Sequence, residues 1–455
     1  MLRLRVSPYN IYVPVDQNEM LLIHAYCGSV DVVPLEVGER LQAGDLCLDQ
    51  VYLDFFLSRG YCTTRTPEEE RTRLMALADK ILERQRSSVN FVVMPTFECN
   101  FACPYCFQND LRDSGRYSGA LSPDKVDAMF QAMESILAKK DSRNRKIVLY
   151  GGEPLLAKNR PVIEMVLAAG KGLGYVFEAT TNGFELDAYL DLLGPGGIRR
   201  LQISVDGPAE IHNRYRVARS GESTFTRITE NIERALDVGA FVNMRVNTNR
   251  GNLGGLEELA RHIDQRGWVE RQNFKAYVAA IHEGDNAGRQ FFYVELLKEL
   301  SRINRGLGKT VLHNEGGEYG QRLLKLMRGK LAAAYSPVAC SAHLGEYVFG
   351  WDGMIYPCWE VVGHEGGSIG RYEPVFEIDE RKADRWHSRT LNKLSECQRC
   401  RYALFCAGGC ALHSAKRSAD LTTPYCQGFD SVFQYHMRNT YESLVRPNET
   451  EYISF

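Results

Sequence analysis

The feature that most constrains the fold is a sixfold alternation of apolar strands and amphipathic helices between residues 90 and 310. Short apolar runs, such as NFVVMP at 90–95 and LQISV at 201–205, are each followed by a segment with helical periodicity. This alternation is typical of parallel strands joined by crossover helices, in an open sheet or a partial barrel. In both arrangements the chemistry takes place at the carboxyl ends of the strands.

The segments on either side of this core differ from it. Residues 1–89 contain alternating runs that predict short strands, followed by a helix that starts with a capping box at Thr66 and Glu69. We therefore expect a small α+β module there. Residues 330–430 lack regular periodicity and are rich in Cys, Gly and aromatic residues, and 431–455 predict a helical tail. The expected core itself spans 90–310.

The cysteines of this chain are unusually numerous and clustered. There are 13 among 455 residues, and ten of them lie in groups: three at 99–106, five at 397–426, and Cys340 and Cys358 between. The net charge of −2 does not favour a nucleic-acid or polybasic membrane protein, and no apolar run approaches the ~18 residues of a membrane span. We expect a cytoplasmic protein, in which disulfides are rare, so the groups indicate metal or iron–sulfur binding.

The first group, Cys99-x3-Cys103-x2-Cys106, directly follows the first strand of the core. A structural zinc site normally has four protein ligands, and no nearby Cys or His supplies a fourth. Three thiolates around a [4Fe–4S] cluster would instead leave one iron open for a substrate or cofactor. A zinc site or a purely structural site is the alternative.

This segment, including Tyr105 before the third cysteine, resembles the cluster motif of the radical S-adenosylmethionine (SAM) enzymes. The resemblance implies a partial (β/α)6 TIM-like barrel in which Cys99, Cys103 and Cys106 hold the catalytic cluster. It further implies that SAM chelates the open iron and is cleaved by one electron, from a donor such as flavodoxin or ferredoxin. The resulting 5′-deoxyadenosyl radical abstracts a substrate hydrogen, and the protein orients and shields the reactants.

Other strand ends resemble the family's cofactor-binding motifs. GGEP at 151–154 follows the second strand, TNG at 181–183 the third, and SVDGP at 204–208 the fourth. The two glycines allow close approach of the backbone to a ligand. The cofactor-binding residues implied are Gly151, Gly152, Glu153, Asn182, Ser204 and Arg227.

Among these residues, Glu153 is expected to accept a hydrogen bond from the cofactor's amino group. Ser204 and Arg227 are assigned to its carboxylate, with Arg245 in the fifth strand as the runner-up for the arginine. A structural turn is the alternative for GGEP, and Asp206 is expected either to brace its turn or to contact the cofactor.

The second cysteine array resembles the SPASM extension of peptide- and protein-modifying radical SAM enzymes. A zinc ribbon is the alternative, but seven thiolates exceed one tetrahedral site. The resemblance implies two auxiliary [4Fe–4S] clusters, three clusters in all. One would use Cys397, Cys400, Cys406 and Cys426, and the other Cys340, Cys358 and Cys410.

The sequence departs from the sulfatase-maturating members of the family at two places. Glu346 stands where they have a further cysteine, and Trp359, followed by Glu360, where they have an aspartate base. The cluster of Cys340 therefore lacks an obvious fourth ligand. Glu346, His343 or a distant residue would complete it, or one iron stays open for a substrate thiolate.

These observations predict an oxidoreductase that modifies a ribosomally made precursor peptide. The N-terminal segment resembles leader-peptide recognition modules, which bind a peptide by adding a strand to a sheet edge; a packing extension of the barrel is the alternative. A thioether or carbon–carbon cross-link is the favoured product, ahead of epimerisation. Sulfatase-type side-chain oxidation and a non-enzymatic iron–sulfur redox protein are the alternative functions.

Overall fold

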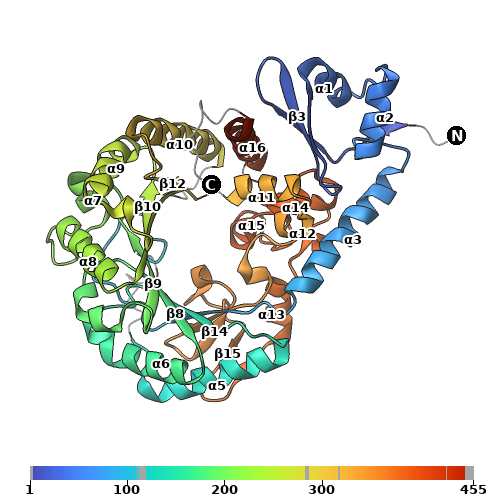
Figure 1. Ribbon diagram of the computed structural model, residues 1–455. Coiled ribbons are helices and arrows are strands. Elements are labelled where there is room, and N and C mark those ends of the chain that lie inside the picture. Colours follow the sequence, from blue (N-terminus) through green and yellow to red (C-terminus); the bar gives the residue numbers. More distant parts are fainter. Residues whose placement is uncertain are drawn as a thin grey trace.

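The expected partial barrel forms the centre of the molecule. The computed structural model describes residues 4–109, 111, 119–281, 286–315, 318–426 and 428–445. Six parallel strands lie side by side in chain order: β6 (Asn90–Met94), β7 (Lys146–Leu149), β8 (Val176–Thr181), β9 (Ile198–Ser204), β10 (Phe241–Thr248) and β11 (Phe274–Ala280). Figure 1 shows helices covering the outside of these strands as an incomplete ring. The predicted α/β fold class is confirmed.

The outer helices are amphipathic, as their sequences predict. They are α5 (Pro123–Lys140), α6 (Arg160–Gly172), α7 (Ala209–Tyr215), α8 (Phe225–Asp237), α9 (Leu256–Gln265) and α10 (Asn286–Leu307). In α8, Ile228, Ile232 and Leu236 are spaced four residues apart and are all buried against the sheet. The third unit differs from the expectation, because its helix is replaced by the 3₁₀ segment η2 (Leu186–Leu192).

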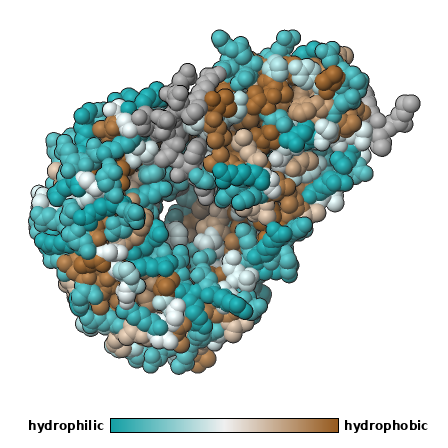
Figure 2. Space-filling model, in the orientation of Figure 1, coloured by the Kyte–Doolittle hydropathy of each residue, from teal (hydrophilic) through white to brown (hydrophobic). Residues whose placement is uncertain are grey.

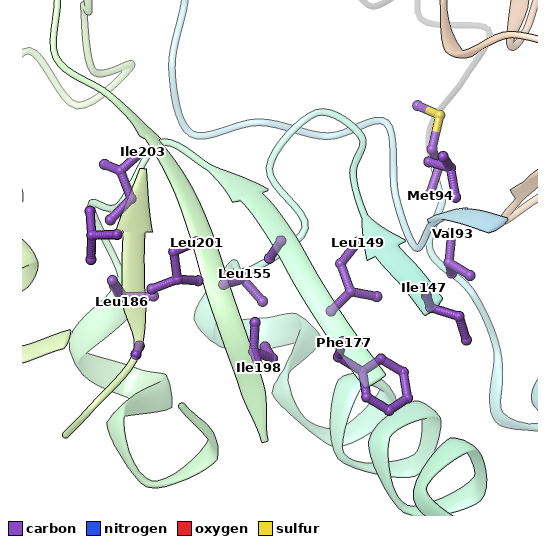
Figure 3. Close-up of a cluster of buried hydrophobic side chains, with 14 of the residues drawn as sticks. Val93, Met94, Ile147, Leu149, Leu155, Phe177, Leu186, Ile198, Leu201 and Ile203 are labelled. Atoms are coloured by element: carbon purple, nitrogen blue, oxygen red, sulfur yellow. The ribbon is translucent and has the colours of Figure 1, made fainter. Parts of the chain in front are cut away.

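Alternate residues of each barrel strand face opposite sides of the sheet. One set packs against the helices, where Figure 3 shows Ile147, Leu149 and Phe177 among the buried side chains. The other set lines the interior of the barrel, and on β10 it consists of Asn243, Arg245 and Asn247. The hydrophobic core is therefore a layer between strands and helices, and the barrel interior is left polar.

The Cys-rich region is continuous with the barrel sheet, which its lack of periodicity did not indicate. β13 (Glu346–Gly350) pairs in parallel with β6 at one edge of the barrel, and β12 (His313–Asn314) with β11 at the other. Three antiparallel strands extend the sheet beyond β13: β14 (Met354–Tyr356), β15 (Gly370–Arg371) and β16 (Glu377–Ile378). All five residues of β13 are buried, so this region is anchored to the barrel edge by a short apolar strand.

Short helices complete this region. They are α11 (Glu318–Met327), α12 (Leu331–Ala334), α13 (Glu380–His387), α14 (Ala403–Cys406), α15 (Ala411–Ser418) and α16 (Phe429–Val445). Helix α16 begins two residues before the tail expected at 431–455, of which 446–455 are outside the described residues. Over the described part of the chain, no helix combines the length and hydrophobicity that crossing a membrane requires.

The N-terminal segment is a small α+β unit. Its antiparallel sheet has the order β2 (Asn10–Pro14), β3 (Glu19–His24), β4 (Val30–Pro34), and β1 (Arg5–Val6) pairs with β5 (Cys62–Thr63). Helices α1 (Leu35–Gln42) and α2 (Gln50–Arg59) follow the sheet, and α3 (Pro67–Gln85) runs on to the barrel. The expected capping box is present in α3, where Thr66 Oγ1 accepts from Glu69 N at 3.2 Å and Glu69 Oε2 from Thr66 N at 2.7 Å.

The two faces of this N-terminal sheet have different partners. Tyr12, Met20 and Leu22 pack on the unit's own helices. The opposite face forms one buried cluster with residues of the Cys-rich region and α16, including Phe405 and Phe433. Figure 1 accordingly shows the unit beside α14 and α16.

Candidate active site

One polar cavity of about 820 Å³ occupies the interior of the barrel. The three cysteines of the first group line it, together with residues from the ends of β7, β8, β9 and β10. Residues of the Cys-rich region, among them Glu346 and Trp359, line it as well. Figure 2, in the orientation of Figure 1, shows a hollow between the barrel and the Cys-rich region. The two cysteine regions therefore meet around one chamber.

The cysteine loop is held in place by the turn after β7. A Cβ atom on Gly152 would lie 2.2 Å from the carbonyl oxygen of Glu98, and one on Gly151 would lie 2.4 Å from that of Thr96. Gly151 also has a φ of +144°, which favours glycine. Gly152 N donates to Thr96 O at 3.2 Å, and Glu153 N to Glu98 O at 2.8 Å. The glycines thus allow close approach of this turn to the cysteine loop. Both also line the cavity, and their predicted contact with a ligand stays a prediction.

Glu153 connects this turn to the end of β8. Its buried carboxylate accepts from Thr181 Oγ1 and Asn182 N, both at 2.6 Å, and from Leu155 N at 2.9 Å. Burial raises the pKa of Glu153 to about 7, and these donors oppose the shift. The carboxylate also lines the cavity, and its contact with a cofactor amine stays a prediction.

Asn182 lies between this turn and the cysteine loop. Its Nδ2 donates to Asn100 Oδ1 at 2.7 Å and lies 4.0 Å from Cys99 Sγ. Its own Oδ1 accepts from Phe184 N at 2.9 Å, which fixes the orientation of the amide. The structure therefore places Asn182 next to Cys99, and its contact with a cofactor stays a prediction.

Ser204 ends β9, and Asp206, which follows the strand, anchors a buried network. The Tyr105 hydroxyl donates to Asp206, and Asn247 N donates to Asp206 Oδ1 at 2.9 Å. Burial raises the pKa of Asp206, while the charge of Arg216 and these donors lower it. Asp206 thus braces the turn and holds Tyr105 of the cysteine motif, whereas Ser204 lines the cavity.

The structure singles out an arginine that sequence reasoning missed. Arg216 is 9% exposed, lines the cavity, and donates from Nη1 to the Tyr105 hydroxyl at 3.1 Å. Its Nε is buried and has no hydrogen-bond partner. The charge of the Cys103 thiolate also acts on this guanidinium. Its place in an aperiodic turn after α7 gave no signal in a single sequence.

The two arginines predicted from sequence lie elsewhere. Arg227, on α8, is absent from the cavity lining; its side chain is 41% exposed and lies 3.3 Å from Asp187. Arg245 does line the cavity, at 3.7 Å from Glu315. Of the three arginines, Arg216 and Arg245 are therefore placed to meet an anionic ligand.

The seven cysteines of the second array form two groups. Burial, and after it the charges of the nearby Cys406, Cys400 and Cys426, raise the pKa of Cys397 to about 12. These four side chains lie close together.

The second group contains the three other cysteines and one carboxylate. Burial raises the pKa of Cys340, and Glu346 and Cys410 add to this. Cys358 is likewise affected first by burial and then by Glu346, Glu360 and Cys340. Within the described ranges, no three Cys, His, Asp or Glu side chains converge tightly enough for a single metal ion. An all-thiolate group of four and a group of three thiolates with a carboxylate suit iron–sulfur ligation.

Three further residues were expected near the second group. Glu346 is 2% exposed and lines the cavity. His343 is buried, with Nδ1 3.0 Å from Trp386 O, and is absent from the cavity lining. Trp359 lines the cavity and contacts the Tyr150 ring with centroids 5.7 Å apart, so an indole forms this part of the cavity wall.

Comparisons with known proteins agree with this geometry. Residues 93–263 match the radical SAM superfamily. The GTP 3′,8-cyclase of Vibrio atlanticus is 31% identical over 150 residues, 33% of this chain and 42% of that enzyme. The chain thus spans less than half the length of the first curated relatives it matches. The cysteine-type anaerobic sulfatase-maturating enzyme of Clostridium perfringens is 23% identical over 369 residues, 74% of this chain and 93% of that enzyme.

Solved structures extend the likeness beyond the barrel. Native anSMEcpe with bound AdoMet has a TM-score of 0.57 at 18% identity, over 78% of this chain and 98% of that one. The same enzyme with AdoMet and the Cp18Cys peptide has a TM-score of 0.56 at 17% identity, over the same shares. Streptococcus suis SuiB bound to S-adenosylmethionine has a TM-score of 0.50 at 14% identity, over 92% of this chain and 98% of that one. At these identities the likeness concerns the fold.

Residues 93–263 are therefore a radical SAM domain. The radical SAM domain that the Cys99 motif predicted is thus confirmed. Beyond this domain, the likeness of the chain to the solved structures is one of fold.

Proposed function

We propose that the protein is a radical SAM maturase that abstracts hydrogen from a ribosomally made precursor peptide and installs a thioether or carbon–carbon cross-link. The observation that carries this proposal is the single chamber shared by the Cys99 loop and the Cys340 region. A peptide side chain in this chamber would lie between the site of radical formation and an auxiliary cluster that accepts the electron left after bond formation. An electron donor such as flavodoxin or ferredoxin would supply the first electron.

The chain's residues provide binding, orientation and shielding at this site. Cys99, Cys103 and Cys106 would hold a [4Fe–4S] cluster that, with SAM bound, supplies the 5′-deoxyadenosyl radical. Ser204 would position the SAM carboxylate, and Arg216 rather than Arg227 would neutralise it, because its buried guanidinium faces the chamber. The walls of the barrel exclude water, which protects a radical from side reactions.

The auxiliary clusters are part of this proposal. Cys397, Cys400, Cys406 and Cys426 would hold one [4Fe–4S] cluster, and Cys340, Cys358 and Cys410 the other. The proximity of the thiols within each group supports this assignment. Together with the catalytic cluster, the protein would carry about twelve iron atoms in three four-iron clusters.

The N-terminal unit would bind the leader of the precursor peptide along strand β4. The outer edge of β2 is partly covered, because Arg438 of α16 donates to Pro14 O at 2.7 Å, whereas β4 is the other edge of the sheet. His24 N donates to Ser29 O at 2.9 Å, so these two residues form a hydrogen-bonded pair. In an antiparallel ladder, hydrogen-bonded pairs alternate with pairs whose N–H and C=O groups point away from the partner strand. The backbone N–H of Val32 therefore points away from β3, and its side chain is 37% exposed.

This proposal of leader binding is tested at Val32. Val32→Pro removes the outward N–H and leaves the β3–β4 hydrogen bonds in place, and Val32→Thr retains the N–H as a matched control. We expect the proline variant to bind a precursor peptide, encoded beside this gene, at least tenfold more weakly, with SAM cleavage in the absence of peptide unchanged. Equal affinity of both variants and wild type would assign the N-terminal unit to packing alone.

Sulfatase-type oxidation of a protein side chain is the second candidate function. It is favoured by the match to the Clostridium perfringens enzyme over 93% of that enzyme's length. Trp359 in the chamber wall and Glu346 near Cys340 favour the cross-linking function instead. Mass spectrometry separates the two candidates: a formylglycine product on a sulfatase-derived Cys peptide supports the second, and hydrogen loss with a new cross-link in the precursor peptide supports the first.

A further inference from the structure

Glu346 is a buried carboxylate whose charge the protein leaves unmatched. It is the first residue of β13, where the Cys-rich region joins the barrel edge, and it is 2% exposed. Ser341 Oγ donates to its Oε2, and Oε1 is buried with no partner. Burial of an ionised carboxylate without compensation is costly, so such groups are normally paired or bound to a metal.

Two other carboxylates that line the same cavity have cationic partners. Glu178 lies 3.6 Å from Lys146 and 3.7 Å from Arg200, and Glu315 lies 3.7 Å from Arg245. Among the residues that the structure describes, no ion pair involves Glu346. Glu153, the other buried carboxylate of this cavity, accepts three hydrogen bonds in place of an ion pair. Glu346 has a single donor and no cationic partner in the described residues.

Thiols lie near the Ser341–Glu346 pair. Its charge acts on both Cys340 and Cys358, and Cys410 acts on Cys340 in turn. Ser341, which orients the carboxylate, directly follows Cys340, and its Oγ lies 3.9 Å from Cys340 Sγ. Three thiols and a carboxylate, one oxygen of which has no hydrogen-bond partner, therefore belong to one cluster of side chains.

We infer that Glu346 Oε1 is the fourth ligand of the auxiliary cluster held by Cys340, Cys358 and Cys410. This inference rests on the proposed auxiliary clusters, and it assigns their incomplete site a Cys3Glu donor set. Iron would supply the positive charge that the buried carboxylate lacks. A carboxylate is a harder ligand than a thiolate, so the iron on Glu346 would be the most weakly held iron of the cluster.

The test uses the full chain with Cys99, Cys103 and Cys106 replaced by Ala, so that the auxiliary sites alone hold iron. In this background we compare Glu346→Gln, which keeps the shape but is a poor ligand, with Glu346→Cys, which restores a thiolate. Glu360→Gln is the matched control, since Glu360 also acts on Cys358 but is half-exposed. His343→Gln tests the other side chain near Cys340. The readouts are iron content, EPR and Mössbauer spectra, and the rate of iron loss to a chelator, with circular dichroism as a check of folding.

We expect the background protein to hold about eight iron atoms, in two four-iron clusters. Glu346→Gln should lose about one iron and give a [3Fe–4S] EPR signal after mild oxidation, and should lose iron to a chelator at least tenfold faster. Glu346→Cys should retain the four-iron cluster and lose iron more slowly than the parent, and Glu360→Gln should match the parent.

Two outcomes would overturn the inference. In one, Glu346→Gln keeps both four-iron clusters and the chelation rate of Glu360→Gln. In the other, the three-iron signal arises from His343→Gln instead. A background protein without any iron would overturn the proposed auxiliary clusters themselves, which is a different result from an intact cluster that is insensitive to Glu346.

Discussion

Gly152→Ala should release the cysteine loop from the turn after β7. The backbone φ of Gly152 lies outside the left-handed region, so alanine is conformationally acceptable and the effect is steric. The new Cβ would lie 2.2 Å from Glu98 O and 2.4 Å from Phe97 O, both of them backbone atoms. Because neither can turn aside as a side chain would, the loop or the turn has to move.

The expected cost follows from these contacts. Overpacking of a tightly packed site costs about 1–3 kcal/mol. Displacement also weakens two hydrogen bonds, Gly152 N to Thr96 O and Glu153 N to Glu98 O, at about 1 kcal/mol each. The free energy that holds the loop in its ligating position should fall by about 3–5 kcal/mol, which is a factor of ~100 to ~3000 in that equilibrium.

The assay is iron content together with 5′-deoxyadenosine formation from SAM after reduction with dithionite. Gly152→Ala should lose catalytic-cluster iron and at least 95% of cleavage, with auxiliary iron retained. Gly172→Ala is the matched control, because its Cβ at the end of α6 would meet no atom within 4 Å, and it should behave as wild type. Wild-type iron and cleavage in Gly152→Ala would refute the steric reasoning.

Two further predictions concern charge and pH. Arg216→Ala should raise the KM for SAM at least tenfold, whereas Arg227→Ala should change it less than twofold, and equal effects in steady-state assays would contradict the assignment of Arg216. Burial lowers the pKa of His24 to about 3, of His212 to about 3 and of His436 to about 4. Protonation therefore favours the unfolded chain, in which His titrates near 6.5. The contribution of these histidines to the free energy of unfolding is complete above that pH and is lost below it, by about 2 kcal/mol per histidine at pH 5. The Tm should fall between pH 7.5 and pH 5, less so in His24→Gln, and a Tm that is constant or rises would contradict this.

The barrel strands were predictable because their signal is local. Each of β6–β11 is a short apolar or alternating run, and all but β8 are followed by a helix with one apolar face. Helix α3 shows its capping box within four residues. The cysteine motifs are local as well. Such patterns can be recognised in a single sequence because the interactions that form them are between neighbours along the chain.

The remaining features depend on contacts between distant segments. Strand β13 is five residues long and pairs with β6, some 250 residues earlier in the chain. Arg216 reaches the chamber from an irregular turn, and the glycines after β7 are required by the carbonyl oxygens of the cysteine loop. In each case the residue type was visible, but its partner was set by the tertiary fold.

The most direct test of the account is 5′-deoxyadenosine formation by the reconstituted, reduced protein, measured with its precursor peptide present. We expect wild type to form 5′-deoxyadenosine and to convert the peptide to a cross-linked product. The variant with Cys99, Cys103 and Cys106 replaced by Ala should do neither while keeping about eight iron atoms in its auxiliary clusters. Undiminished SAM cleavage by that variant, or cleavage by wild type that leaves every candidate peptide unmodified, would contradict a radical SAM peptide maturase.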